Sequence, residues 1–200
     1  MDSISPFEDK TYRRGKWYFG TDEEKIWEAK KRKREWISMI QKRMPSNYRP
    51  SVMEVGVWEG EHAWIIYHCL APSALFLVDA FKDMNKHVGI YSADDEDAYN
   101  WVREIFKNAP EVEVIKNTSV NAAKMFQDKS IDYIYIDAAH DHDNALIDMN
   151  AWWPKVTDIG ALCGHDAGSE GVFGALTEFN KPGLEISPNG TEWVIPKIVG

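Results

Sequence analysis

Two aspartates and two histidines in segment 131–168 have the residue types and spacing of a ligand site. The apolar run IDYIYI ends at Asp137, and His140 follows at the start of a predicted helix. A second apolar run, GALC, leads into His165 and Asp166. If both runs are parallel strands of one sheet, the four side chains reach its carboxyl edge, where open α/β sheets bind ligands. Carboxylates and imidazoles at such an edge can hold a divalent cation or move a proton.

The composition is that of one globular domain. The 200 residues are 44% hydrophobic and 28% charged, which is ordinary for a globular protein. The longest apolar run, 63–78, is interrupted by polar residues and is shorter than the roughly 20 residues that span a bilayer, so we expect no membrane partner. The N-terminus MDSISPFEDK lacks the apolar segment of a signal peptide, and we expect a cytoplasmic protein. The net charge of −9 argues against nucleic acid as the main partner, because phosphate binding needs a basic surface.

Apolar runs alternate with helical segments from residue 51 onward. We expect strands at 51–57, 74–79, 112–115, 131–137 and 160–163. We expect helices at 60–70, 94–108, 120–126, 143–156 and 172–179. The last segment, LEISPNGTEWVIP, predicts two strands around a Pro-Asn-Gly turn. The predicted fold is a Rossmann-like, doubly wound α/β fold: a mostly parallel seven-stranded sheet with a C-terminal antiparallel hairpin.

The first 50 residues stand apart from this alternation. A leader that contains Trp17-Tyr18-Phe19 precedes a predicted helix from Thr21 to about Met44. Pro45 and Pro50 then end the helix. We therefore divide the chain into a leader and helix at 1–50 and a ligand-binding domain at 51–200. The leader has two alternative roles, a lid over the acceptor or a contact in a homo-oligomer, and the sequence leaves both open.

The turn after the first strand favours a nucleoside ligand without a pyrophosphate. Its sequence, EVGVWEG, contains only Gly56 and Gly60, whereas a dinucleotide fingerprint needs G-x-G-x-x-G. Glu54 and Glu59 add negative charge, which disfavours phosphate and suits a cationic nucleoside such as S-adenosylmethionine. Asp79 ends the second strand, where a carboxylate can accept both hydrogens of a ribose diol. A tight turn without a ligand would use the same glycines, but the position of Asp79 favours a cofactor site.

The order of these motifs resembles that of the class I S-adenosylmethionine-dependent methyltransferases. The chain contains, in order, EVGVWEG, FLVDAF, VIKNTSVNAAKMF, IDYIYIDAAHDHDNALIDMNAWWPKV and GALCGHD. Among these enzymes it is most similar to the small-molecule O-methyltransferase group called methyltransferase family 24. The resemblance covers 51–180, and its most specific part is D-x-x-H followed by W-x-x-P-K and G-H-D. The chain departs from the commonest pattern at Trp58, where a glycine is frequent.

The resemblance implies S-adenosylmethionine as cofactor and suggests which residues bind it. Gly56 and Gly60 would shape the methionine pocket, and Glu54 would lie near the sulfonium or the amino group. Asp79 would hold the ribose, and Asp137 would also border the cofactor. The residues beside the adenine would be Asn117, Thr118 and Ser119.

Methyl transfer to oxygen requires an acceptor that is well positioned and anionic. Asp137 and Asp166 could hold Mg²⁺ or another divalent cation that lowers the acceptor's pKa. Metal-dependent relatives usually carry a further Asp, Asn or Glu beside the second aspartate, so here either His165 would join as a ligand or water would fill that position. In the alternative, His140 or His165 serves as general base beside Asp137.

We therefore predict S-adenosylmethionine-dependent methyl transfer to a hydroxyl of a small molecule, such as a sugar or a natural-product intermediate. Two other readings keep the same fold. In one, the chain performs hydroxylase-like chemistry with a metal and no methyl transfer. In the other, it is a nucleoside-binding module without turnover.

Overall fold

The computed structural model describes residues 35–82 and 95–197. The aromatic leader, most of the helix predicted to start at Thr21, and residues 83–94 between the second strand and the next helix lie outside the described residues. The role of segment 1–50 therefore stays a prediction. Among the described residues, no helix combines the length and the apolar character needed to cross a membrane.

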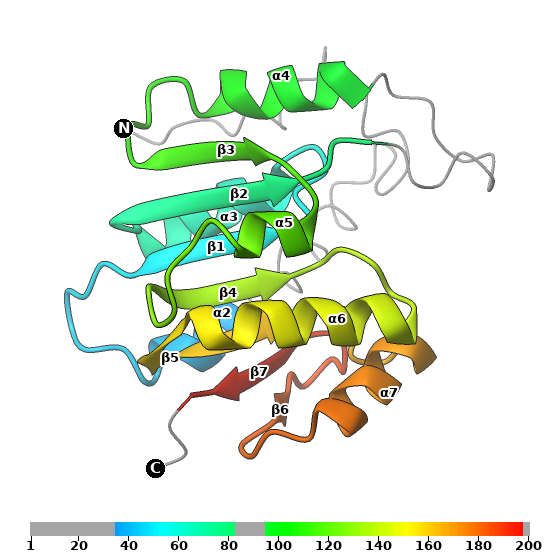
Figure 1. Ribbon diagram of the computed structural model, residues 1–200. Coiled ribbons are helices and arrows are strands. Elements are labelled where there is room, and N and C mark those ends of the chain that lie inside the picture. The colour runs from blue at the N-terminus through cyan, green and yellow to red at the C-terminus, as the bar shows by residue number, and fades with distance from the viewer. Residues whose placement is uncertain (1–34, 83–94, 198–200) are drawn as a thin grey trace.

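A seven-stranded sheet forms the centre of the molecule (Figure 1). Its strands are β1 (Ser51–Val55), β2 (Ala74–Asp79), β3 (Val112–Lys116), β4 (Ile131–Ile136), β5 (Val156–Gly164), β6 (Glu185–Ile186) and β7 (Trp193–Pro196). The order across the sheet is β3-β2-β1-β4-β5-β7-β6. Strands β1 to β5 pair in parallel, whereas β7 pairs antiparallel with both β5 and β6. The predicted sheet and its C-terminal hairpin are confirmed, and the strand order reverses between β1 and β4.

Helices cover both faces of this sheet. One face carries α2 (Glu35–Gln41), α3 (Glu61–Leu70) and α4 (Asp95–Ile105). The other face carries α5 (Ser119–Ala123), α6 (His142–Trp152) and α7 (Glu170–Phe179). Figure 1 shows α5 and α6 in front of the strands and α3 behind them. The central strands β1 and β4 are therefore buried on both sides, which explains why their sequences are mostly apolar runs.

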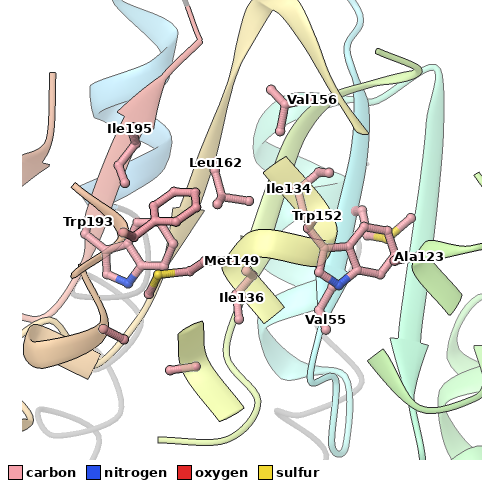
Figure 2. Close-up of a cluster of buried hydrophobic side chains, with 14 of the residues drawn as sticks. Val55, Ala123, Ile134, Ile136, Met149, Trp152, Val156, Leu162, Trp193 and Ile195 are labelled. Atoms are coloured by element: carbon pink, nitrogen blue, oxygen red, sulfur yellow. The ribbon is translucent and has the colours of Figure 1, made fainter. Parts of the chain in front are cut away.

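The larger hydrophobic cluster lies between the sheet and helices α5 to α7 (Figure 2). Trp152 and Met149 of α6 are almost completely buried there against Ile134 and Leu162. The indole N–H of Trp152 also donates to Oγ of Ser119 at 2.9 Å, so its polar atom is satisfied. This packing holds α6 on the sheet and thereby fixes the loop that leads into the helix.

Two element boundaries differ from the predicted ones by four residues, and the others by fewer. Strand β5 begins at Val156, four residues earlier than the apolar run indicated, because polar and exposed residues at 157–159 still belong to the strand. Helix α6 ends at Trp152, because Pro154 lies in a short 3₁₀ helix, η2 (Trp153–Lys155), that follows it. Neither difference moves the carboxyl ends of the strands.

Leu162 tests the packing of the core. The side chain is fully buried, so Leu162→Ala should lower the free energy of unfolding by about 2–5 kcal/mol through lost burial and a cavity. Ile159→Ala is the matched control on the same strand, because Ile159 is 64% exposed. We expect the control to change stability by less than about 0.5 kcal/mol. Urea unfolding followed by circular dichroism measures both, and equal losses would contradict this core.

Candidate active site

Backbone hydrogen bonds continue past the ends of the central strands and fix the residues that follow. The N–H groups of Gly56, Asp137 and His165 donate to carbonyl groups of neighbouring strands at 2.9, 2.8 and 3.0 Å. These residues follow β1, β4 and β5, which are adjacent in the sheet. The sequence-predicted site residues of these three strands therefore lie at one carboxyl edge, at the point where the strand order reverses.

Gly56 permits a close approach between β1 and the residue after β4. It adopts a φ of +90°, and a Cβ added to it would lie 2.0 Å from the carbonyl oxygen of Asp137. Gly60, with a φ of +83°, ends the same turn as the N-cap of α3. Trp58 between them has a φ of +50°, which is rare for a bulky side chain. The two-glycine turn thus requires glycine at position 56 for steric reasons.

Asp79 shapes this turn. Its Oδ2 accepts hydrogen bonds from the N–H groups of Val57 and Trp58, both at 2.8 Å, and its Oδ1 accepts from Phe81 N at 2.6 Å. The sequence analysis predicted only ribose binding for Asp79 and missed these three hydrogen bonds. A carboxylate offers about four acceptor positions, so with three in use about one remains, enough for one hydroxyl of a ribose and not for both. The turn and the predicted ribose site are therefore built on the same side chain.

The other predicted cofactor residues lie beside Asp79 or beneath the turn. Asn117, directly after β3, donates through its N–H to the carbonyl oxygen of Asp79 at 2.9 Å. Its side-chain oxygen accepts from Thr118 N at 2.9 Å, and Thr118 is the N-cap residue of α5, whose first residue is Ser119. Glu54 is 1% exposed and lies within β1. The roles of these four residues toward a cofactor remain predictions.

The two aspartates and two histidines of the sequence analysis lie close together. His140 Nε2 is 2.9 Å from Oδ2 of Asp166 and 3.6 Å from Oδ1 of Asp137. His165 Nδ1 is 3.2 Å from Oδ1 of Asp166 and 3.9 Å from Oδ1 of Asp137. His140 is 55% exposed, whereas the other three side chains are mostly buried. A small molecule that reaches this cluster would therefore meet His140 first.

The loop after β5 is held in a constrained conformation. Asp166 has a φ of +56°, in the left-handed region. The hairpin fixes this loop from one side: the indole N–H of Trp193 donates to His165 O, and Ala167 N donates to Thr191 O, both at 3.0 Å. Such conformations persist only where the surroundings determine them, and they cluster at functional sites. Sequence reasoning did not foresee this role of the hairpin.

Hydrogen bonds within the cluster shift the pKa values of its members. The bonds to Asp137 and Asp166 raise the pKa of His140 to about 10. Burial raises the pKa of Asp166, but the hydrogen bonds from both histidines outweigh burial and lower it overall. For His165, burial lowers the pKa, but the bond to Asp166 and the charge of Asp137 raise it overall. In this arrangement His140 is an imidazolium at neutral pH and holds the two carboxylates together.

Asp137, His140 and Asp166 also form a set that could hold a metal ion. One ligand atom from each residue lies within 4.8 Å of the other two. The set contains His140 where the sequence analysis expected His165. Two carboxylates and one imidazole fit a divalent cation that accepts oxygen and nitrogen ligands. A cation in this position would replace the proton of His140 as the positive charge between the two acids.

Comparison with known protein families gives one match. The model of methyltransferase family 24, described as a methyltransferase domain, matches residues 53–167. This range contains the two-glycine turn, Asp79 and all four residues of the acid and histidine cluster. No curated protein sequence matches the chain.

Solved structures share the fold at low sequence identity. An O-methyltransferase from Bacillus cereus in complex with SAH has a TM-score of 0.56 and 12% identity, with 84% of this chain and 81% of that chain covered. CalS11, a TDP-rhamnose 3'-O-methyltransferase of calicheamicin biosynthesis, has a TM-score of 0.58 and 13% identity, with 80% and 77% covered. Spermidine synthase from Thermotoga maritima has a TM-score of 0.52 and 13% identity, with 76% of this chain but 55% of that chain covered.

The pKa of His140 tests the electrostatics of the cluster. In chelator-treated protein, we expect NMR titration to show His140 protonated from neutral pH up to about 10. Because this pKa lies above the ordinary 6.5, the stabilisation is fully present below pH 6.5 and is lost as the pH rises through about 10. Asp166→Asn should lower the pKa of His140, because one of its two charged partners becomes neutral.

His142 is an internal control in the same spectra, since its partners are Asp143 and Glu178. Its titration should not respond to Asp166→Asn. A wild-type His140 that titrates near 6.5 would contradict the described geometry.

Proposed function

The chain belongs to methyltransferase family 24, whose members are class I S-adenosylmethionine-dependent methyltransferases, and we propose that it methylates a hydroxyl of a small molecule. The observation that carries the proposal is the contact between Gly56 and Asp137. A Cβ on Gly56 would lie 2.0 Å from Asp137 O, so the cofactor turn borders the acid and histidine cluster directly. A donor bound at the turn would present its methyl group beside side chains that can orient and deprotonate an acceptor.

The family's cofactor, S-adenosylmethionine, supplies an electrophilic methyl group. The chain's own residues have three tasks. The turn at 56–60 and Asp79 bind the nucleoside. Glu54 places negative charge near the cationic end of the donor, which favours that ligand over a neutral one. Asp137 and Asp166 orient the acceptor side of the site, because both carboxylates face the same histidine.

Transfer is an in-line displacement that forms an oxygen–carbon bond and returns the sulfur–carbon electron pair to sulfur. The acceptor hydroxyl must also lose its proton. In the version that we favour, Asp137, His140 and Asp166 would hold a divalent cation, which would lower the pKa of the hydroxyl so that its proton could pass to water. In the second version, His140 or His165 takes the proton at a ring nitrogen.

Oxygen as the acceptor atom is supported by the fold likeness to the two O-methyltransferases. This similarity concerns the fold only, and this chain has a similar fold likeness to spermidine synthase, which is not an O-methyltransferase. We propose a sugar or a natural-product intermediate as the acceptor class. The half-exposed His140 leaves the cluster open to a ligand of that size.

Donor binding tests the cofactor site. Asp79→Ala removes the three hydrogen bonds that shape the turn and the predicted bond to the ribose. We expect affinity for S-adenosylhomocysteine to fall by about tenfold or more, since each hydrogen bond to a charged group is worth about 1.5–3 kcal/mol. Isothermal titration calorimetry measures this affinity in the wild-type protein and in the variant. Asp158→Ala is the control, because Asp158 is exposed and pairs with Lys129 near the start of β5, whereas the site lies at the carboxyl ends of the strands. Unchanged affinity in Asp79→Ala would refute the site.

The need for a cation is tested with a labelled methyl donor and a panel of sugars, nucleotide sugars and phenols. We expect chelator to abolish transfer, and added Mg²⁺ or Mn²⁺ to restore it. Asp166→Asn should lower the rate by about a hundredfold or more, a typical cost of losing acid–base assistance. Asp143→Asn is the control, because Asp143 lies near the cluster but is 89% exposed.

Other outcomes of this assay are equally decisive. If chelator leaves the rate unchanged while His140→Ala or His165→Ala abolishes it, the histidine version is correct. If His140 is the base, the rate of the chelator-treated enzyme should increase as the pH rises toward 10, because the free base of His140 becomes more abundant. Full activity in every variant would mean that the cluster has only a structural role.

A further inference from the structure

A buried chain of polar contacts connects helix α2 to the strand that precedes the cofactor turn. Nε1 of Trp36 lies 3.0 Å from Nε2 of His62, and Nδ1 of His62 lies 2.7 Å from Oε1 of Glu54. The three residues are 0%, 4% and 1% exposed. Water therefore has little access to these bonds, and each carries more weight than it would at the surface.

The chemistry of the indole sets the direction of both hydrogen bonds. The indole nitrogen of Trp36 can only donate, so Nε2 of His62 must accept. An imidazole that accepts at Nε2 carries its proton at Nδ1 and is neutral. The Nδ1–H of His62 then donates to Glu54. A neutral donor fixes the carboxylate without cancelling its negative charge.

Trp36 itself is held from three directions. Its backbone N–H donates to Oε2 of Glu192 at 2.8 Å, and Oε1 of Glu192 accepts from the hydroxyl of Tyr135 at 3.2 Å. The Tyr135 ring also packs on the Trp36 indole, with centroids 4.8 Å apart. His62 of α3, Tyr135 of β4 and Glu192, which directly precedes β7, thus fix the orientation of the indole. In that orientation its N–H points at His62.

We propose that Trp36 and His62 are positioning residues for the methyl donor: they hold the charged Glu54 carboxylate against the cofactor turn. Glu54 precedes Gly56 by two residues on β1, so its position and that of the turn are coupled. A fixed negative charge at this depth attracts the sulfonium and ammonium groups of the donor. The inference rests on the proposed function, because it assumes that the donor binds at residues 56–60.

The test compares two ligands that share an adenosine group. S-adenosylmethionine carries the sulfonium and the amino acid, whereas 5'-methylthioadenosine is neutral and lacks both. In His62→Phe, which keeps a ring but removes both nitrogens, we expect affinity for S-adenosylmethionine to fall about tenfold. Affinity for 5'-methylthioadenosine should change less than about twofold, because Glu54 faces only the charged part. Calorimetry measures both.

Three further variants separate positioning from stability. His62→Asn keeps an amide donor near the place of Nδ1 and should recover most of the lost affinity. Trp36→Phe removes the indole donor together with part of the buried ring, and it should give a partial loss with the same ligand preference. Tyr67→Phe is the control on the same helix, because it removes a hydrogen bond to Glu111 far from the turn. It should lower the melting temperature, if anything, and leave both affinities unchanged.

Each result has one meaning. If the wild-type protein binds neither ligand, the proposed function fails and not merely this inference. If it binds both ligands, and His62→Phe weakens both equally or neither, the positioning role is refuted. If His62→Phe does not fold, the ligand preference of Trp36→Phe and His62→Asn decides the question in the same way.

Discussion

The close approach of Gly56 to Asp137 is the constraint on which the site depends. A side chain at position 56 would collide with the backbone after β4, since its Cβ would lie 2.0 Å from Asp137 O. The absence of a side chain lets the two strand ends meet, and the donor turn and the acid cluster then become neighbours. A parallel sheet supplies the common edge, but only glycine at this position closes the gap between the two halves of the site.

Several residues along that edge have backbone conformations that are unfavourable for their type. Trp58, Phe81 and Asp166 all have φ values near +50° and follow three different strands. The Asp79 carboxylate and the hairpin hold them there: Asp79 accepts from Trp58 N and Phe81 N, and Trp193 donates to His165 O beside Asp166. The large buried clusters on both faces supply the stability that offsets this local strain. The fold is thus regular at its centre and irregular where ligands would bind.

The sequence predicted the elements well because strands buried on both faces have a distinct pattern. The runs ALFLVD and IDYIYI are mostly apolar; the first ends in Asp79, and the second is followed directly by Asp137 at the sheet edge. That pattern was enough to predict the fold and to bring Asp137, His140 and Asp166 together. It could not reveal which histidine lies between the acids, because His140 and His165 reach the cluster from different loops.

Contacts that depend on tertiary packing were beyond sequence reasoning. Asp79 binds three backbone N–H groups, and no local pattern distinguishes such a carboxylate from one that only binds a ribose. The signal for His62 was present but weak: it is a polar residue on the buried side of a helix that reads EHAWIIYHCL. A histidine in such a place needs polar partners, and Glu54 and Trp36 come from β1 and α2.

Buried or half-buried carboxylates occur in two polar clusters of the molecule, and a different kind of partner stabilises them in each. Glu54 is buried and accepts a hydrogen bond from His62, and in the proposed role its carboxylate is the negative charge that a cationic ligand meets. Asp137 and Asp166 instead share His140, whose raised pKa of about 10 makes it a cation at neutral pH. The first arrangement keeps an attraction available, whereas the second keeps two like charges together until another cation takes the place of the proton. In the proposed function, donor binding and acceptor activation would therefore depend on different charged groups, although the turn and the cluster meet at Gly56.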